Sequence, residues 1–471
     1  MALQEAVPAF KNVFQGFKVV PLGCTVTLTQ TTLQVERKSS SRSGERHELG
    51  RRVANLLAGA WRDFAQTANR NPDLSEAELA DIVPLLCESG AGALAWRRIC
   101  YTPLANTDSG RQLQEVYRLF RLSALIHERE IAHVLSLLRA EDIEPVLVKG
   151  WAIARLYPDA ALRPYGDIDL CIRPDQFAQA SAALKCLEDI NGHCVDLHCG
   201  FARIGQTRAQ DTGDIQRFRR FKINQGDMRV WDDAFKRSRL VPLDKGTSKT
   251  QPPTFNVTAV SADIGLRHRQ SVRILCDEDH LRLLSLHLLR SGVRRPTWLS
   301  DIALLLEART KDFDWDVCLG QRSNRTATRN LNWLATTIGL AHQLLGADLG
   351  KIENTTLAKQ ARSLPRWVVP AVLCQWGRSR LASPGPNVQS HLSSHRRRIW
   401  DIGLWTNLIN RFDNPVRSTA AVGGQFNNWP RLPYRLAELV WRLPEVAPQL
   451  QLFAEQFRAR RVKVSRRVAA V

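Results

Sequence analysis

The sequence predicts an α+β fold, in which a small β-sheet with flanking helices is followed by a mainly α-helical C-terminal part. Apolar residues recur at helical spacing over about 49–140 and again from Asp277 onward. Between these two parts, a β-branched run and a period-two alternation predict strands. Hydrophobic residues make up 44% and charged residues 24% of the chain, as in most soluble globular proteins, so most of it is expected to fold.

The predicted elements divide the 471 residues into five parts. A mobile extension is expected at 1–48 and a helical lead-in at 49–140. The core is expected at 141–275, with an insertion at 203–272. A helical domain follows at 276–382, and a basic Trp-containing helical region at 387–471. The extension ends in a polar run with nothing to bury, and the insertion lacks a sustained period.

Three strands are predicted in the core. Residues 145–150 form an apolar run closed by glycine, whereas 167–172 and 193–199 alternate polar and apolar residues. One or two helical turns are expected over 151–157, and a longer helix after Asp175. Alternation places the polar side chains of the second and third strands on one side of the sheet.

The chain is strongly basic, with 66 Lys and Arg against 46 Asp and Glu and a formal charge of +20. Such an excess favours anionic partners, although a solvated basic face is an equally good interpretation. The tryptophans and arginine clusters of 387–471 predict either contact with an acidic membrane surface or RNA, or buried core tryptophans.

The expected location is the cytoplasm. Ten scattered cysteines without paired spacing and an N-terminus without a secretory signal pattern indicate a reducing compartment. No apolar run reaches the ~18 residues that span a bilayer, so no transmembrane segment is predicted.

Three aspartates are the strongest candidates for chemistry. Asp167 and Asp169 are two residues apart on a predicted strand, so both carboxylates leave the same face. Asp196 lies on the predicted neighbouring strand and faces the same way. Paired carboxylates suit Mg²⁺, and three of them on adjacent strands suit two-metal phosphoryl transfer. An Asp-x-Asp sequence alone is weak evidence, because such pairs also cap loops.

The residues around the aspartates form a longer motif, whose parts are Lys149-Gly150, Tyr157-Pro158, Arg163-Pro164-Tyr165-Gly166-Asp167-Ile168-Asp169-Leu170 and Val195-Asp196-Leu197-His198. This motif resembles the bacterial uncharacterised nucleotidyltransferase family of the DNA polymerase β-like superfamily. The resemblance is specific over about 140–200 and extends more loosely over 80–345.

The resemblance implies a nucleotidyltransferase core with a small mixed β-sheet, and an enzyme that transfers a nucleoside monophosphate from an NTP to a hydroxyl-bearing acceptor. Asp167 and Asp169 would bind the metal ions, Mg²⁺ or alternatively Mn²⁺, and Asp196 would complete the triad and help to activate the hydroxyl. Pyrophosphate would leave. The acceptor is left open, because a small molecule, a protein and RNA all fit.

Four residues are candidates for nucleotide binding. By resemblance, Gly150 would let the backbone approach the phosphates, and Gly166 belongs to the same motif. Lys149 and Arg163 would neutralise triphosphate oxygens. Alternatively, Lys149 could be a solvated strand end, and Arg163 could pair structurally with Asp159 or Asp175. Trp151 stands where the broader superfamily has a small residue, and its indole is expected to narrow the phosphate loop.

Three further residues are assigned supporting roles. His198 would support Asp196 or lie near the acceptor, with an ordinary hydrogen-bonded polar residue as the alternative. His287 and Asp301 would hydrogen-bond one another or contact substrate, with tethering of two helices as the alternative. A zinc site at His193, Cys194, His198 and Cys199 is disfavoured, because alternate side chains of a strand point apart.

Two other classes of function remain as alternatives. One is a non-catalytic descendant of the nucleotidyltransferase fold, used for nucleotide sensing or protein interaction. The other is a basic RNA- or membrane-associated protein, which would bind in a salt-sensitive way that is indifferent to Mg²⁺ and to loss of Asp167.

Overall fold

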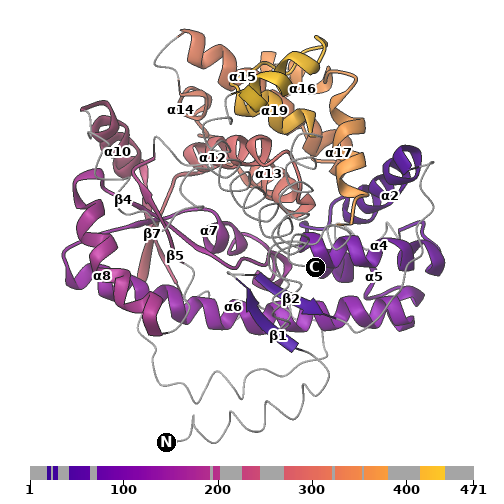
Figure 1. Ribbon diagram of the computed structural model, residues 1–471, viewed down its shortest axis with the longest axis horizontal. Helices are drawn as coiled ribbons and strands as arrows, with labels where there is room; N and C mark the ends of the chain where they lie inside the picture. Colours follow the sequence, from indigo (N-terminus) through magenta and orange to yellow (C-terminus); the bar gives the residue numbers. More distant parts are fainter. Residues whose placement is uncertain are drawn as a thin grey trace, which may run out of the picture.

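The computed structural model describes residues 18–22, 25–29, 42–63, 72–190, 195–201, 225–243, 270–320, 324–352, 355–379 and 414–440. They form an α+β fold with one small mixed sheet and many helices, which confirms the predicted fold class. In Figure 1 the sheet lies at the left, with the long helix α6 (Asp108–Ala140) below it and the C-terminal helices above. A separate hairpin pairs β1 (Lys18–Leu22) with β2 (Thr25–Thr29).

The central sheet has five strands in the order β5-β4-β3-β7-β6. Their bounds are Val146–Leu147 for β3, Ile168–Ile172 for β4, Val195–Cys199 for β5, Arg239–Pro242 for β6 and Ser271–Ile274 for β7. Strands β4 and β5 are parallel, as are β3 and β7, whereas β3–β4 and β6–β7 are antiparallel. The sheet is therefore mixed.

The two faces of the sheet pack against different parts of the chain. Leu147, Leu170 and Ile172 belong to a core cluster with α6 and α8 (Phe177–Ile190). Val146 and Cys171, one residue out of phase, belong to the main core, which includes α12 and α13. Because side chains alternate along a strand, this second face also receives Asp169. The bounds of these two helices are Asp277–Arg290 and Pro296–Ala308.

Strand β3 is shorter than the predicted run 145–150. Lys149 has φ 54° and ψ −140°, which ends the extended conformation, and α7 (Gly150–Ala154) begins at once. The one or two helical turns predicted over 151–157 therefore fall within α7 and the residues that follow it. Short 3₁₀ turns lie at Pro103–Asn106, Ala160–Leu162, Pro174–Gln176 and Gly350–Ile352.

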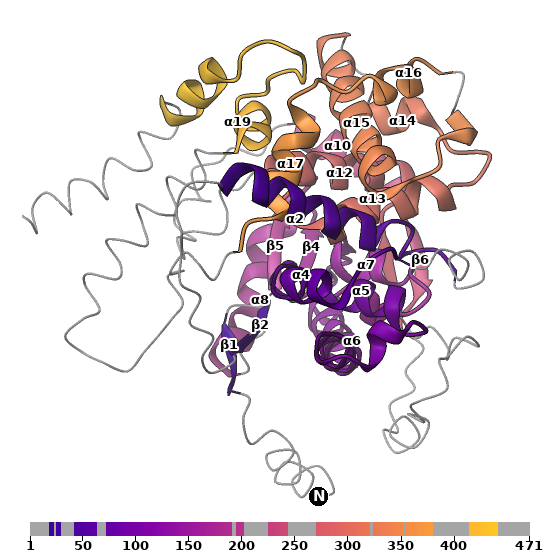
Figure 2. The ribbon, with the colours of Figure 1, turned by 90° about the vertical axis from the view of Figure 1, so that its right-hand side faces the viewer.

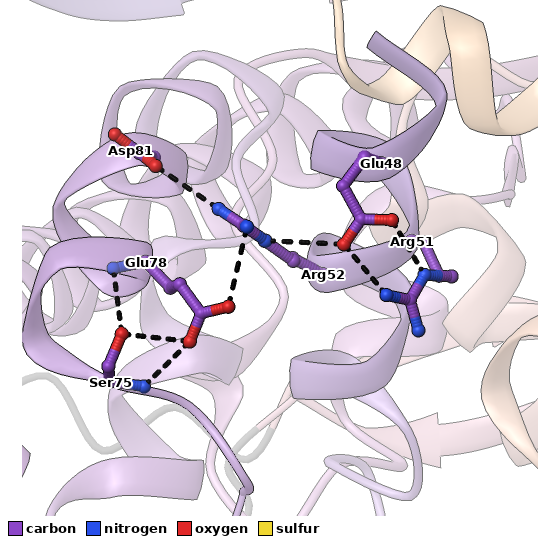
Figure 3. A network of polar contacts seen from close by, with 6 residues as sticks. All are labelled: Glu48, Arg51, Arg52, Ser75, Glu78 and Asp81. Carbon is purple, nitrogen blue, oxygen red and sulfur yellow. Dashed lines mark hydrogen bonds and ion pairs between the residues drawn. The ribbon is translucent and has the colours of Figure 1, made fainter. Parts of the chain in front are cut away.

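The N-terminal helices pack against the body of the protein and against one another. Helix α2 spans Arg42–Leu57, so it begins inside the predicted extension 1–48. It is followed by α4 (Glu76–Ser89) and α5 (Gly92–Ile99). Arg52 of α2 contacts Glu48 on its own helix and Glu78 and Asp81 on α4, which ties the first turns of α4 to α2 (Figure 3).

The C-terminal helices are α14 (Trp315–Leu319), α15 (Asn324–Leu345), α16 (Thr356–Arg362), α17 (Val368–Trp376) and α19 (Pro415–Ala421). Helix α17 packs against α2, far away in the sequence (Figure 2). Two glycines permit this close approach: a Cβ at Gly50 would lie 2.0 Å from the carbonyl oxygen of Leu373, and one at Gly377 would lie 1.9 Å from that of Arg46.

The predicted insertion at 203–272 contains regular structure. Helix α10 (Gln225–Arg237) and β6 lie within it, and Arg237 joins α10 to α12 through an ion pair of 2.8 Å with Asp279. Strand β6 is at the edge of the sheet and mostly exposed, so it has no buried face to produce a period-two pattern. Residues 203–224 and 244–269 of the insertion lie outside the described residues.

Of the predicted C-terminal region 387–471, the structure describes 414–440, in which Trp429 is 72% exposed. Trp400, Trp405 and Trp441 of that region lie outside the described residues. None of the helices that are described is long and apolar enough to cross a membrane.

Candidate functional site

The register of the sheet brings two of the three predicted aspartates together. Strands β4 and β5 run parallel, and Asp169 is the direct neighbour of Asp196. Asp167 comes immediately before β4, two residues from Asp169 on the same face. Asp169 is only 3% exposed, whereas the other two are half-buried. The structure therefore gathers the carboxylates on the face that looks toward α12.

Lys149 provides the buried positive charge of the site. Its Nζ lies 2.6 Å from Oδ1 of Asp169. Burial by itself disfavours the ammonium, but Asp169, Asp167 and Asp196 outweigh it, so the pKa of Lys149 is raised. One cation thus faces three carboxylates.

His198 also points into the cluster. It lies two residues beyond Asp196 on β5, and its Nε2 is 2.9 Å from Oδ1 of Asp169 and 3.4 Å from Oδ2 of Asp196. One ligand atom from each of these three residues lies within 4.8 Å of the others. A carboxylate-rich set of this size fits a divalent cation.

The pKa values of the two aspartates of the Asp-x-Asp pair are shifted in opposite directions. Burial and the neighbouring Asp169 carboxylate raise the pKa of Asp167. Burial acts in the same sense on Asp169, but the Lys149 ammonium and the His198 hydrogen bond outweigh it and lower the pKa of that carboxyl. Asp169 is therefore a stable anion, whereas the Lys149 and Arg163 cations only partly offset the effects of burial and of Asp169 on Asp167.

Comparison with known protein families matches residues 75–346 to the family described as uncharacterised nucleotidyltransferase. The chain belongs to this family. Comparison of the chain with curated proteins and with solved structures finds no match. The matched span includes the whole acidic cluster together with α12 and α13, whereas α2 and α17 lie outside it.

Helix α12 supplies a contact that the sequence did not reveal. His280 is 2% exposed, and its Nε2 accepts a hydrogen bond of 3.1 Å from the backbone N–H of Lys149. Burial, aided by the positive charge of Arg239, lowers the pKa of His280 to about 3, so the ring is neutral and Nε2 can accept. His280 therefore holds the backbone at the residue whose φ is positive. Its position seven residues before His287, on the same face of a helix, was the only available signal.

His287 packs beside the site, and the structure shows no hydrogen bond between it and Asp301. Its ring lies 4.5 Å from that of Trp298. Burial and then the Lys149 ammonium lower the pKa of His287 to about 3, so this imidazole is neutral as well. Asp301 instead accepts from Arg163 and Tyr157.

Arg163 is engaged in a buried ion pair. Its Nη2 and Nε lie 2.8 and 3.1 Å from Oδ2 of Asp301, and Tyr157 donates to Oδ1 of the same carboxylate at 2.9 Å. Arg163 is 5% exposed and Asp301 is fully buried. The contact anchors the segment that leads into β4 onto α13. The alternative partners behave differently: Asp159 accepts from Tyr117, and Asp175 pairs with Arg173.

The turn between β3 and α7 places Gly150 next to the acidic segment. Gly150 has φ 29°, and a Cβ there would lie 3.4 Å from the carbonyl oxygen of Asp167. Gly166 directly precedes Asp167. Trp151 is 2% exposed, packs in the cluster with α6 and α8, and donates its indole N–H to Glu128 at 3.1 Å. Its ring thus lies in the core, on the side of α6.

Arg295 is a second residue that sequence reasoning missed. It immediately precedes α13, and its guanidinium lies 5.1 Å from the ring centre of Trp298. Burial lowers the pKa of Arg295, whereas the Asp167 carboxylate acts in the opposite sense. The guanidinium therefore interacts electrostatically with the acidic cluster. No carboxylate of the described residues forms an ion pair with it. No sequence motif marks this arginine, because the Asp167 carboxylate that it faces lies far away in the chain.

Proposed function

We propose that this nucleotidyltransferase transfers a nucleoside monophosphate from an NTP to a hydroxyl-bearing acceptor. The acceptor oxygen forms a bond to the α-phosphorus, the bond from that phosphorus to the bridging oxygen breaks, and pyrophosphate leaves with the electron pair. The observation that best supports this proposal is the direct pairing of Asp169 with Asp196 across parallel strands, with Asp167 at the entrance of the same strand.

Asp167, Asp169 and Asp196 would hold the divalent cations, with Mg²⁺ or Mn²⁺ as the ion. When bound, such ions lower the pKa of the attacking hydroxyl and neutralise the triphosphate and the leaving pyrophosphate. Asp196 is half-buried, and its carboxylate would receive the hydroxyl proton. The excess of carboxylates over cations in this cluster is the physical reason that a metal is needed.

The nucleotide would lie against the turn that begins at Lys149. There, Gly150 and Gly166 would let the backbone approach the phosphate oxygens. The bidentate pair with Asp301 supports a positioning role for Arg163, in place of the triphosphate contact expected from the sequence. Arg295, whose guanidinium lies over the Trp298 ring, would contact a phosphate group of the nucleotide instead.

The test is calorimetric titration of NTP into the protein, with and without Mg²⁺ or Mn²⁺. We expect metal-dependent binding by the wild type and none by the variant that combines Asp167→Asn with Asp169→Asn. Asp175→Asn, a matched change at an exposed side chain, is expected to bind as the wild type does. Transfer is then sought with small molecules, proteins and RNA as acceptors.

The competing function is a non-catalytic module for nucleotide sensing or protein interaction. It predicts no NTP binding, or NTP binding that ignores both the metal and the double substitution. Either result would replace the transferase proposal.

A further inference from the structure

The donor set on the acidic face contains nitrogen as well as oxygen. Asp169 and Asp196 offer carboxylate oxygens, and His198 offers an imidazole nitrogen, all within 4.8 Å of one another. The side chain of His198 is 12% exposed, so packing restricts the direction of its ring. The imidazole nitrogen is therefore held in a fixed position within the site.

The orientation of the ring is the key observation. Nε2 is the nitrogen that faces both carboxylates, at 2.9 Å from Asp169 and 3.4 Å from Asp196. Alternation along β5 places residues 196 and 198 on one face, and the register places residue 196 beside residue 169. A cation held by the two carboxylates thus has this nitrogen among its nearest donors.

Lys149 increases the importance of a third donor. Oδ1 of Asp169 is shared by Nζ of Lys149, at 2.6 Å, and Nε2 of His198. A carboxylate oxygen that already accepts from an ammonium is a weaker ligand for another cation than a free one, because the two cations repel each other. The affinity for a metal ion then depends more strongly on the remaining donors.

Divalent cations differ in how they value an imidazole. Mg²⁺ is a hard cation that strongly prefers oxygen and keeps several water molecules. Mn²⁺ also accepts carboxylates but binds more tightly to mixed nitrogen and oxygen sites, as do the later first-row ions. An all-oxygen site suits Mg²⁺, whereas one imidazole shifts the preference toward Mn²⁺.

We propose that His198 is a direct ligand of the divalent cation and makes the site selective for Mn²⁺ over Mg²⁺. This inference rests on the proposed function, because it assumes that the acidic cluster holds a metal ion. It goes beyond that function by naming a nitrogen ligand and by ranking the two ions.

The experiment uses the full chain without nucleotide and titrates it with Mn²⁺ and with Mg²⁺. Bound Mn²⁺ is then studied by pulsed electron paramagnetic resonance, which detects a directly coordinated ¹⁴N nucleus. In the wild type we expect ¹⁴N coupling and tighter binding of Mn²⁺ than of Mg²⁺. In His198→Gln we expect loss of the coupling and a fall in Mn²⁺ affinity of about 10- to 100-fold. Mg²⁺ affinity should change by less than about threefold.

His133→Gln, at an exposed histidine of α6, is the matched control and should keep both the coupling and the selectivity. The wild-type spectrum decides the matter even where the His198→Gln protein does not fold. Mn²⁺ binding that depends on Asp169 but shows no ¹⁴N coupling would overturn the role of His198 and leave the proposed function intact. If the wild-type protein binds neither Mn²⁺ nor Mg²⁺, both the role of His198 and the proposed function are wrong.

Discussion

Lys149 and Arg163 both carry a buried positive charge in the stretch of chain between β3 and β4, but their surroundings differ. Arg163 meets a single carboxylate in a bidentate pair, and Tyr157 donates to the same group. Lys149 meets Asp169 inside a cluster that also contains Asp167 and Asp196. The charge of the first pair is balanced, whereas the cluster has more carboxylates than ammonium groups.

This difference separates a structural ion pair from a site for a ligand. A balanced, fully hydrogen-bonded pair gains nothing from another ion, so it serves to fix the chain that approaches β4. A cluster with surplus negative charge is stabilised by a further cation, whichever element supplies it. Burial alone does not distinguish the two cases, because Lys149 and Arg163 are both buried.

The largest effect is expected from breaking the balanced pair. Arg163→Met leaves Asp301 and Tyr157 buried without their cation, so the free energy of unfolding should fall by about 3–5 kcal/mol. Urea unfolding followed by circular dichroism measures it. The double variant with Asp301→Leu should recover most of the loss, because no charge is left unpaired. Unchanged stability together with lost NTP binding would show that Arg163 contacts the triphosphate after all.

The next effect compares Asp169 with Asp167 in the metal-free protein. Asp169 has a lowered pKa, so its contribution to stability is present above the unfolded value of about 4 and is lost as pH falls through the folded value. Asp169→Asn should therefore lower stability at pH 7, by about 1–2 kcal/mol, because the Lys149 ammonium loses its partner.

Asp167 should behave in the opposite way. Its pKa is raised, so the stability that it contributes below about pH 4 is lost as pH rises through the folded value. Asp167→Asn should thus stabilise the metal-free protein at pH 7, and thermal melts from pH 3 to 8 test both signs. A loss of stability in both variants at pH 7 would contradict the difference between the two carboxylates.

The smallest effect concerns Arg295, which resembles Lys149 in facing surplus negative charge. Arg295→Met should weaken binding of the metal–NTP complex about tenfold, or about 1.4 kcal/mol, while the unfolding midpoint stays close to that of the wild type. Calorimetry measures the affinity. Arg51→Met, at a surface pair of α2, is the control and should leave the affinity unchanged. Equal affinity in Arg295→Met and the wild type would remove this arginine from the nucleotide site.

The sequence predicted the acidic face of the sheet because the evidence for it is local. Alternation within 167–172 and 193–199 states which side chains share a face, and the structure places these runs in neighbouring strands β4 and β5. The helical part from Asp277 onward, which contains α12, α13 and α15, was predicted for the same reason, since the apolar period lies within each segment.

The contacts between distant segments were beyond the sequence. His280 binds the backbone of Lys149 across 131 positions, and Arg163 finds its partner 138 positions away. The positive φ of Lys149 was equally hidden, because a lysine rarely adopts it and no local pattern signals it. Local patterns report which face a side chain occupies, but not which element will cover that face.

The close packing of α2 against α17 bears on how far this protein can be trimmed. Both helices lie outside residues 75–346, the span that matches the nucleotidyltransferase family. Yet Leu56 and Leu57 of α2 are almost completely buried in the core that also contains α12 and α13. Cutting the chain to the matched span would therefore expose apolar surface of α4, α5 and α15, the helices within that span that pack against α2. Helices α2 and α17, which lie on either side of the matched span in the sequence, therefore pack together and cover part of the main core.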